Sequence, residues 1–273
     1  MSFSLTTWNI NSVRLRIDQV IRFLGEHEPD VLCLQETKCP NDQFPLAAFR
    51  ALGYQYVALN GQKGYHGVAT LSRIPFAETM IRQFCDKEDS RHLTVELAGT
   101  GASNGRKGLR IHNFYVPAGG DIPDPEVNPR FAHKLAFLDE LMLWNEQTLP
   151  AERPSILVGD LNVAPYETDV WSHKALLNVV SHTPVETERL ERFRQVSQYV
   201  DAVRTLQPEP EKVYTWWSYR SPDWAAANKG RRLDHIWIAP SLTPALAATK
   251  ITRETRGWER PSDHAPVTVT LQI

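Results

Sequence analysis

Acidic, amide and imidazole side chains stand at the ends of apolar segments throughout this 273-residue sequence. The segments have the length and composition of β-strands, and a polar residue directly follows or precedes each of them. If the strands are neighbours in sheets, their ends meet at one cleft, where α/β proteins usually place their chemistry. The polar residues at these positions are Asn9, Glu36, Asp160, Asn162, Asp234, Asp263 and His264.

These residue types favour a site for a hard divalent cation. Carboxylate and amide oxygens are the donors that Mg²⁺ and Mn²⁺ prefer, whereas zinc favours clustered Cys and His. His264 lies thirty residues after Asp234, a pairing that suits an imidazole oriented by a carboxylate. Metal-assisted hydrolysis of a phosphodiester is the reaction that this set fits best.

Each residue also has an interpretation without chemistry. Asn9 could cap a following helix, and Glu36 could be an ordinary exposed charge. Residues 159–162 could form a turn, because Gly, Asp and Asn are favoured there. Asp263 and His264 could lie in an exposed loop. The functional interpretation rests on the coincidence of all these residues at segment ends.

The composition is that of a globular protein. Hydrophobic residues make up 42% and charged residues 23%, which excludes collagen-like, coiled-coil and largely disordered proteins. No apolar run approaches the roughly 18 residues needed to cross a bilayer. The N-terminus lacks a signal-peptide pattern and the three cysteines are expected to be reduced, so we expect a cytoplasmic protein. The net charge is −2, but residues 204–260 hold ten Lys and Arg against six Asp and Glu, which suits DNA contact and an ordinary solvated surface equally well.

Short β-rich segments alternate with helical patterns from end to end, which indicates a layered α/β protein forming a single domain over residues 1–273. Strands are expected at Phe3–Ile10, Val31–Leu34, Gly67–Ser72, Leu93–Leu97, Leu109–Val116, Ile156–Gly159, His235–Ala239 and Val267–Leu271. Helices are expected at Val13–Leu24, at Asn128–Met142 and from Thr183 onward. Thr183, Pro184 and Glu186 form a helix-capping pattern. The run 31–34 is typical of a strand covered on both faces, and no internal repeat is evident.

Seven motifs in order resemble those of the exonuclease III group of abasic-site DNA endonucleases, within the DNase I-like endonuclease/exonuclease/phosphatase superfamily. They are Trp8–Arg14, Leu32–Lys38, Gly64–Ala69, Asn113–Pro117, Val158–Pro165, Arg232–Asp234 and Ser262–Val267. The Gln-Glu, Gly-Asp-x-Asn and Ser-Asp-His motifs occur across the superfamily, whereas Tyr115 in its Tyr-x-Pro setting and Arg-Leu-Asp indicate the abasic endonuclease branch. The resemblance implies a four-layered α/β sandwich, in which two packed mixed β-sheets are flanked by helices.

The resemblance also implies a metal site. Glu36 would be the principal ligand of Mg²⁺, for which Mn²⁺ would substitute, and Asn9 and Asp263 would complete or support the site. A second metal could be held by Asp160, Asn162 and His264, so the metal count stays open.

Catalytic roles follow from the same resemblance. Asp160 would position and deprotonate the attacking water, and Asn162 would hold that water or a phosphate oxygen. His264, aligned by Asp234, would bind the scissile phosphate. Tyr115 would touch the same phosphate and help the leaving oxygen depart.

On the DNA side, the resemblance places Trp216, Arg231 and Leu233 around a pocket for a flipped, base-free sugar. A small apolar pocket would exclude a normal nucleotide by volume. The positions where related proteins meet the DNA backbone are Lys38, Tyr65 and Arg91. Three residues depart from the family pattern: Asn11 stands where many relatives have Asp, Ala118 where many have an amide, and Arg231 where a bulky apolar residue is common.

The leading hypothesis is a monomeric, Mg²⁺-dependent DNA repair nuclease. It would hydrolyse the phosphodiester 5′ to abasic sites in double-stranded DNA, trim blocked 3′ ends as a phosphatase or phosphodiesterase, and act as a 3′→5′ exonuclease. The alternative is a phosphoesterase of the same superfamily acting on inositol phosphates or sphingolipids, which should bring a lipid-facing apolar loop or a basic phosphate-reading cluster. A glycoside hydrolase would leave the Asp-His pair at 263–264 unexplained, and a catalytically silent DNA-binding module would leave the whole polar set unexplained.

Overall fold

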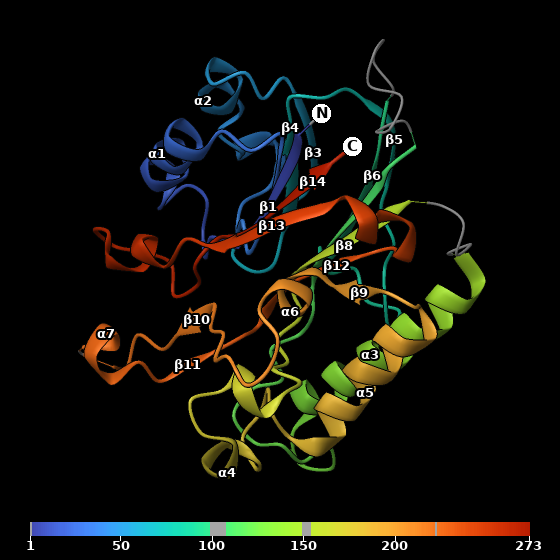
Figure 1. The fold of residues 1–273 in the computed structure, drawn as a ribbon, viewed down its shortest axis with the longest axis vertical. Helices are drawn as coiled ribbons and strands as arrows, with labels where there is room; N and C mark the ends of the chain where they lie inside the picture. The colour runs from blue at the N-terminus through green and yellow to red at the C-terminus, as the bar shows by residue number, and fades with distance from the viewer. Residues whose placement is uncertain (1, 99–107, 149–153, 222) are drawn as a thin grey trace.

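Two six-stranded mixed sheets pack face to face in the computed structural model, which describes residues 2–98, 108–148, 154–221 and 223–273 (Figure 1). The first sheet has the order β13 (Leu246–Ile251), β14 (Val267–Gln272), β1 (Ser2–Asn9), β2 (Val31–Gln35), β4 (Val68–Ser72) and β3 (Tyr56–Asn60). The second has the order β5 (Phe76–Met80), β6 (His92–Leu97), β7 (Arg110–Tyr115), β8 (Ser155–Asp160), β12 (Asp234–Ile238) and β9 (Val200–Asp201). A small third sheet pairs β10 (Trp216–Trp217) with β11 (Gly230–Arg231).

Helices form the outer layers, so the expected four-layered sandwich is confirmed (Figure 1). In Figure 1, α1 (Ile17–His27) and α2 (Leu46–Ala51) lie outside the first sheet, and α3 (Pro129–Thr148) and α5 (Pro184–Val196) lie side by side outside the second. The shorter helices are α4 (His173–Leu176), α6 (Ala202–Leu206) and α7 (Trp224–Ala227). Within the described ranges, no helix is both long and apolar enough to span a membrane.

Both sheets are built on the same plan. Each has a central parallel pair, β1 with β2 and β7 with β8, and every other neighbour in it is antiparallel. The sequence shows no repeat that would have predicted this. Because parallel strands end at the same edge, the last residues of each parallel pair lie together, and the antiparallel strands β12 and β14 begin at that edge.

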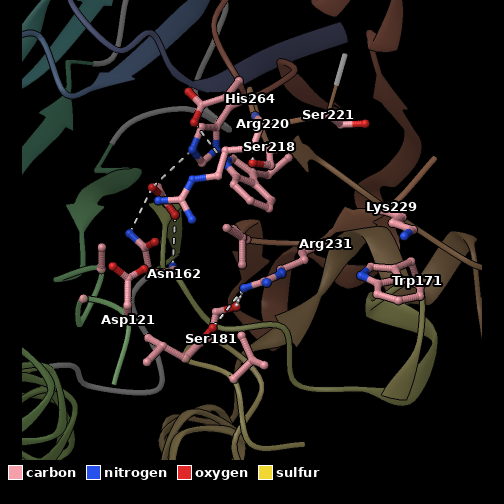
Figure 2. Close-up of a pocket in the computed structure, with 18 of the residues that line it drawn as sticks. Asp121, Asn162, Trp171, Ser181, Ser218, Arg220, Ser221, Lys229, Arg231 and His264 are labelled. Atoms are coloured by element: carbon pink, nitrogen blue, oxygen red, sulfur yellow. Dashed lines mark hydrogen bonds and ion pairs between the residues drawn. The ribbon is translucent and has the colours of Figure 1, made fainter. Parts of the chain in front are cut away.

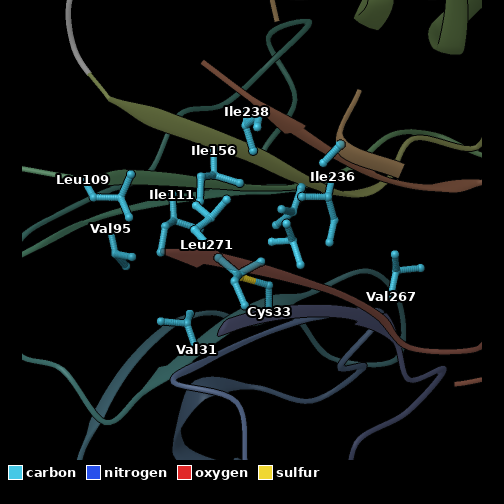
Figure 3. Close-up of a cluster of buried hydrophobic side chains, with 14 of the residues drawn as sticks. Val31, Cys33, Val95, Leu109, Ile111, Ile156, Ile236, Ile238, Val267 and Leu271 are labelled. Carbon is cyan, nitrogen blue, oxygen red and sulfur yellow. The ribbon is translucent and has the colours of Figure 1, made fainter. Parts of the chain in front are cut away.

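The main core fills the space between the sheets (Figure 3). Val31 and Cys33 of β2 point into it and meet side chains of the second sheet such as Ile156. Leu32 and Leu34 point the other way, into a second cluster beneath α1. The expectation that this strand is covered on both faces is therefore confirmed, because alternate residues of a strand face opposite sides.

Helix α5 begins as its capping pattern predicts. Pro184 occupies the first turn, the Thr183 side chain accepts a hydrogen bond from the third helical amide, and the Glu186 side chain accepts from the Thr183 amide. The edge strands β3, β5 and β13, by contrast, were not predicted. Their residues are mostly half-exposed or exposed, so they lack the apolar runs from which buried strands are recognised.

Candidate active site

The polar residues at the strand ends come together at one edge of the two sheets. Asn9 ends β1 and Glu36 directly follows β2, whereas Tyr115 ends β7 and Asp160 ends β8. Asp234 begins β12 directly opposite Asp160 in the sheet register. Chain segments more than 200 residues apart are thus brought to one place by the strand order.

Asn9 joins the two sheets at this edge. Its Nδ2 donates hydrogen bonds to Glu36 Oε1 at 2.9 Å and to Asp160 Oδ2 at 2.9 Å. Its Oδ1 accepts a hydrogen bond from the Asn11 amide at 3.1 Å. The side chain is fully buried, and α1 begins only at Ile17, so Asn9 does not act as a helix cap.

Glu36 and Asp263 are linked by a chain of polar contacts. Lys38 Nζ lies 2.7 Å from Glu36 Oε2 and donates to Asn11 Oδ1 at 2.6 Å. Asn11 Nδ2 in turn donates to Asp263 Oδ1 at 3.1 Å. The second Asp263 oxygen, Oδ2, accepts a hydrogen bond from Trp216 Nε1 at 2.9 Å. Asn11 therefore acts here as a bridge between the lysine and the aspartate.

His264 is held by Asp234, as the sequence spacing suggests. Its Nδ1 lies 2.8 Å from Asp234 Oδ2, and its Nε2 lies 3.8 Å from Asp160 Oδ2. Thr215 Oγ1 donates to the same Asp234 oxygen at 2.6 Å and accepts from the Leu233 and Asp234 amides. The sequence did not predict this role of Thr215, because a threonine beside two tryptophans is typical of an ordinary strand.

The charges of this cluster are strongly coupled. Burial raises the pKa of Asp160 to about 7, and the Asp234 and Glu36 carboxylates add to the rise. Burial alone would lower the pKa of His264, but Asp234 and Asp160 raise it to about 10. The imidazole is therefore a cation at neutral pH. The cluster therefore holds more carboxylates than cations. Its carboxylates are those of Glu36, Asp160, Asp234 and Asp263, and its cations are Lys38 and His264.

This excess of negative charge fits a bound divalent cation. Asp160, Asp234 and His264 offer ligand atoms that lie within 4.8 Å of one another. The buried Oδ1 of Asp234 has no hydrogen-bond partner among the described residues. The donors are mostly carboxylate oxygens, which is the chemistry that Mg²⁺ and related hard ions require.

The backbone at the site is held in an uncommon conformation. Glu36, Lys38 and Asn162 have φ angles of 50°, 51° and 54°, in the left-handed region that few non-glycine residues adopt. Such conformations gather at functional sites, where the surrounding structure compensates their cost. Gly159, directly before Asp160, has φ 140°, and a Cβ there would collide with the Phe114 carbonyl of the parallel neighbour β7.

Tyr115 is packed beneath Arg91. Burial raises the pKa of Tyr115 well above its usual value, and the Glu36 and Asp160 carboxylates reinforce this, so the phenol keeps its proton. The Arg91 guanidinium lies 4.9 Å from the Tyr115 ring and donates to the Tyr115 carbonyl at 3.2 Å. Arg91 is buried and paired with Asp89. At this position Arg91 is better suited to support Tyr115 than to make the DNA-backbone contact that the resemblance implies.

A cavity of about 730 Å³ opens beside these groups (Figure 2). Glu36, Asp160 and His264 line one part of it, and Trp216 and Leu233 line the adjoining wall. Its other lining residues include Asn162, Asp263, Arg231, Trp171, Ser181, Arg220 and Lys229. Tyr65 is not among the lining residues and is 72% exposed, which leaves it free to meet a ligand larger than the cavity.

Lys134 supports the site from below and was not singled out in the sequence. It is fully buried, and its ammonium pairs with the fully buried Glu186 carboxylate. Its Nζ also donates to the backbone carbonyls of Asn162 at 2.8 Å and Ala118 at 3.3 Å. Its spacing could have indicated that it is buried, because residue 134 lies three positions after the buried Phe131 on the apolar face of α3.

Replacement of Lys134 by methionine should destabilise the fold. The variant leaves the Glu186 carboxylate buried without its cation, which lowers the free energy of unfolding by about 3–5 kcal/mol in comparable cases. Urea unfolding followed by circular dichroism measures the change. The double variant Lys134→Met/Glu186→Gln removes both charges and should regain part of the loss. A single variant as stable as the wild type would contradict the assigned ion pair.

The sequence is similar to known proteins over nearly its whole length. The model of the Endonuclease/Exonuclease/phosphatase family matches residues 6–264. Exodeoxyribonuclease III of Haemophilus influenzae is 30% identical over 268 residues, covering 96% of this chain and 97% of the relative.

Solved structures agree as well. An AP endonuclease from Archaeoglobus fulgidus has a TM-score of 0.89 at 30% identity, and the 3′ phosphatase NExo from Neisseria, bound to a product DNA hairpin, has a TM-score of 0.87 at 30% identity. Both comparisons cover 99% of this chain and 100% of the other. The chain therefore belongs to the endonuclease/exonuclease/phosphatase family and is related to exonuclease III and the AP endonucleases.

Proposed function

We propose that this chain, as a monomeric single domain over residues 1–273, is a metal-dependent DNA repair nuclease. It hydrolyses the phosphodiester 5′ to abasic sites in duplex DNA, trims blocked 3′ ends and degrades duplexes from their 3′ ends. The observation that carries the proposal is one cavity in which Asp160, Glu36 and His264 adjoin Trp216 and Leu233. The relatives named as an exodeoxyribonuclease, an AP endonuclease and a 3′ phosphatase support it.

In this mechanism Asp160 is the general base. Its Oδ1 accepts a hydrogen bond from the Asn162 amide, and its Oδ2 accepts from Asn9 and from Asn162 Nδ2. These contacts fix the carboxylate beside the cavity. Asp160 orients a water molecule and takes its proton as the water oxygen bonds to phosphorus. The bond from phosphorus to the 3′ oxygen then breaks, and that oxygen takes up a proton.

Three further groups act on the phosphate. His264, protonated and aligned by Asp234, donates from Nε2 to a phosphate oxygen. Tyr115, which keeps its proton, would donate to the phosphate or the departing 3′ oxygen. Fixed donors aimed at charge that develops in the transition state are worth about 10²–10³ in rate each.

Glu36, with Asn9 and Asp263, would hold Mg²⁺, for which Mn²⁺ would substitute. The bound ion would neutralise the negative charge that gathers on the phosphate during in-line attack. A second ion would find its ligands among Asp160, Asn162 and His264, and His264 would have to give up the proton that it carries at neutral pH. On the DNA side, Trp216 and Leu233 would face the extruded sugar, and Lys38 and Tyr65 would meet the backbone.

A lesion-specific cleavage assay tests the proposal. A duplex with one tetrahydrofuran abasic analogue is incubated with the protein, with Mg²⁺ or with a chelator. We expect cleavage directly 5′ to the analogue, loss of that cleavage with chelator, and no cleavage at the same position of an undamaged duplex. If the protein instead hydrolysed inositol phosphates and left the lesion intact, the superfamily alternative would replace the proposal.

A further inference from the structure

Arg231 ends β11 and Arg232 directly follows it, yet the two charges have different surroundings. Arg232 is fully buried, and Asp169 and Asp201 accept its hydrogen bonds at 2.7–2.8 Å. Among the described residues, Arg231 donates only to neutral groups, from Nη1 to the Val180 carbonyl at 2.9 Å and to Ser181 Oγ at 2.8 Å. Its Nε is buried and has no hydrogen-bond partner among the described residues.

The charge of Arg231 is therefore left without a carboxylate partner in the part of the chain that the structure describes. Burial lowers its pKa, and only the Glu186 carboxylate offsets this. That carboxylate is already paired with Lys134. A partly buried guanidinium in this situation favours an anionic ligand, because charge-assisted hydrogen bonds are the strong ones and an uncompensated buried charge is costly.

Arg231 also lines the same cavity as the reacting groups. Its guanidinium carbon is 5.2 Å from the centre of the Trp216 ring, and the Nε1 of that indole bonds to Asp263. Figure 2 shows the Arg231 side chain directed to Ser181, and His264 and Asn162 line the same cavity. A group attached to the scissile phosphate would enter the space next to this guanidinium.

The cavity lining carries further positive charge. Arg220 and Lys229 line it and are exposed, and the Lys229 ammonium lies 4.8 Å from the centre of the Trp171 ring. Apart from the catalytic carboxylates, the acidic residue among the described lining is Asp121, which is exposed. A neutral abasic sugar makes no use of this charge, whereas a substituent with a carboxylate does.

We propose that Arg231 is a specificity-determining residue that selects DNA 3′ ends whose terminal phosphate carries a carboxylate-bearing substituent. This inference rests on the proposed function. The carboxylate of the substituent is seated on the Arg231 guanidinium while water attacks the phosphorus. The bond to the 3′ oxygen breaks, that oxygen takes up one proton, and the phosphate leaves with its substituent, so one water is consumed and a 3′-hydroxyl remains.

Two 3′-modified oligonucleotides of similar size test the idea. One ends in a 3′-phosphoglycolate, and the other ends in a 3′-(2-hydroxyethyl) phosphate, which lacks the carboxylate. We expect the wild type to prefer the glycolate in kcat/KM by about 10-fold or more, the value of one charge-assisted hydrogen bond. Arg231→Met should bring this ratio to near unity through a higher KM for the glycolate, and Arg231→Lys should restore part of it.

Controls separate selectivity from structure. Lys229→Met removes a more exposed cation of the same cavity and should lower the preference less than Arg231→Met does. If Arg231→Met lowered kcat/KM for the glycolate and the hydroxyethyl substrate equally, Arg231 would be structural and the inference would be overturned. A wild-type preference near unity between the two substrates would also overturn it. Cleavage of the tetrahydrofuran duplex is measured in parallel, because its absence would overturn the proposed function itself.

Discussion

Asp160→Asn should lower kcat on an abasic duplex by about 10²–10⁴-fold, the contribution typical of a general base. Asparagine has nearly the same shape but takes up no proton at neutral pH. It also replaces one acceptor oxygen by a donor at a position where Asp160 receives hydrogen bonds from Asn9 and Asn162. Single-turnover cleavage of the lesion duplex at saturating enzyme measures the chemical step directly.

The fold should survive this change. Burial and neighbouring carboxylates raise the pKa of Asp160, which means that the folded protein disfavours its charge. A neutral side chain relieves that cost, which offsets the hydrogen bond lost to the new amide donor, so the thermal midpoint should stay near the wild-type value. A variant that kept full single-turnover activity would remove Asp160 from the role of base.

Glu36→Gln should severely weaken the binding of Mg²⁺ by the enzyme. Loss of a residue that merely supports a metal ligand costs about 10–100-fold in affinity or activity, and the proposed direct ligand should cost more. Glutamine keeps an acceptor for Asn9 Nδ2, the contact made at 2.9 Å, but it removes the negative charge. Cleavage rates measured over a Mg²⁺ titration should show a midpoint shifted to higher concentration.

Lys38→Met is the matched control for that experiment. Lys38 Nζ pairs with the same carboxylate at 2.7 Å, so this variant breaks the same ion pair while it leaves Glu36 charged. We expect its Mg²⁺ midpoint to be unchanged or lower, because the ion no longer competes with an ammonium for Glu36. If Glu36→Gln titrated like the wild type, another residue would have to be the principal ligand.

The sequence determined a large part of this description. The polar residues at strand ends, the buried strand at 31–34 and the cap of α5 are local patterns, and the structure agrees with each. The seven motifs in order also predicted the family and the four-layered sandwich, and both predictions are confirmed. Such patterns are readable because burial in a strand or helix repeats with a short period along the chain.

Only the tertiary structure decided which partner each polar group has. Asn9 could have been a helix cap but bridges Glu36 and Asp160, and Arg91 lies buried against Tyr115. Arg231 and Arg232 are adjacent in sequence, yet the carboxylates that neutralise Arg232 come from distant segments and none reaches Arg231 among the described residues. Charge compensation depends on distances through space between residues far apart in the chain, and a local pattern carries no record of those distances.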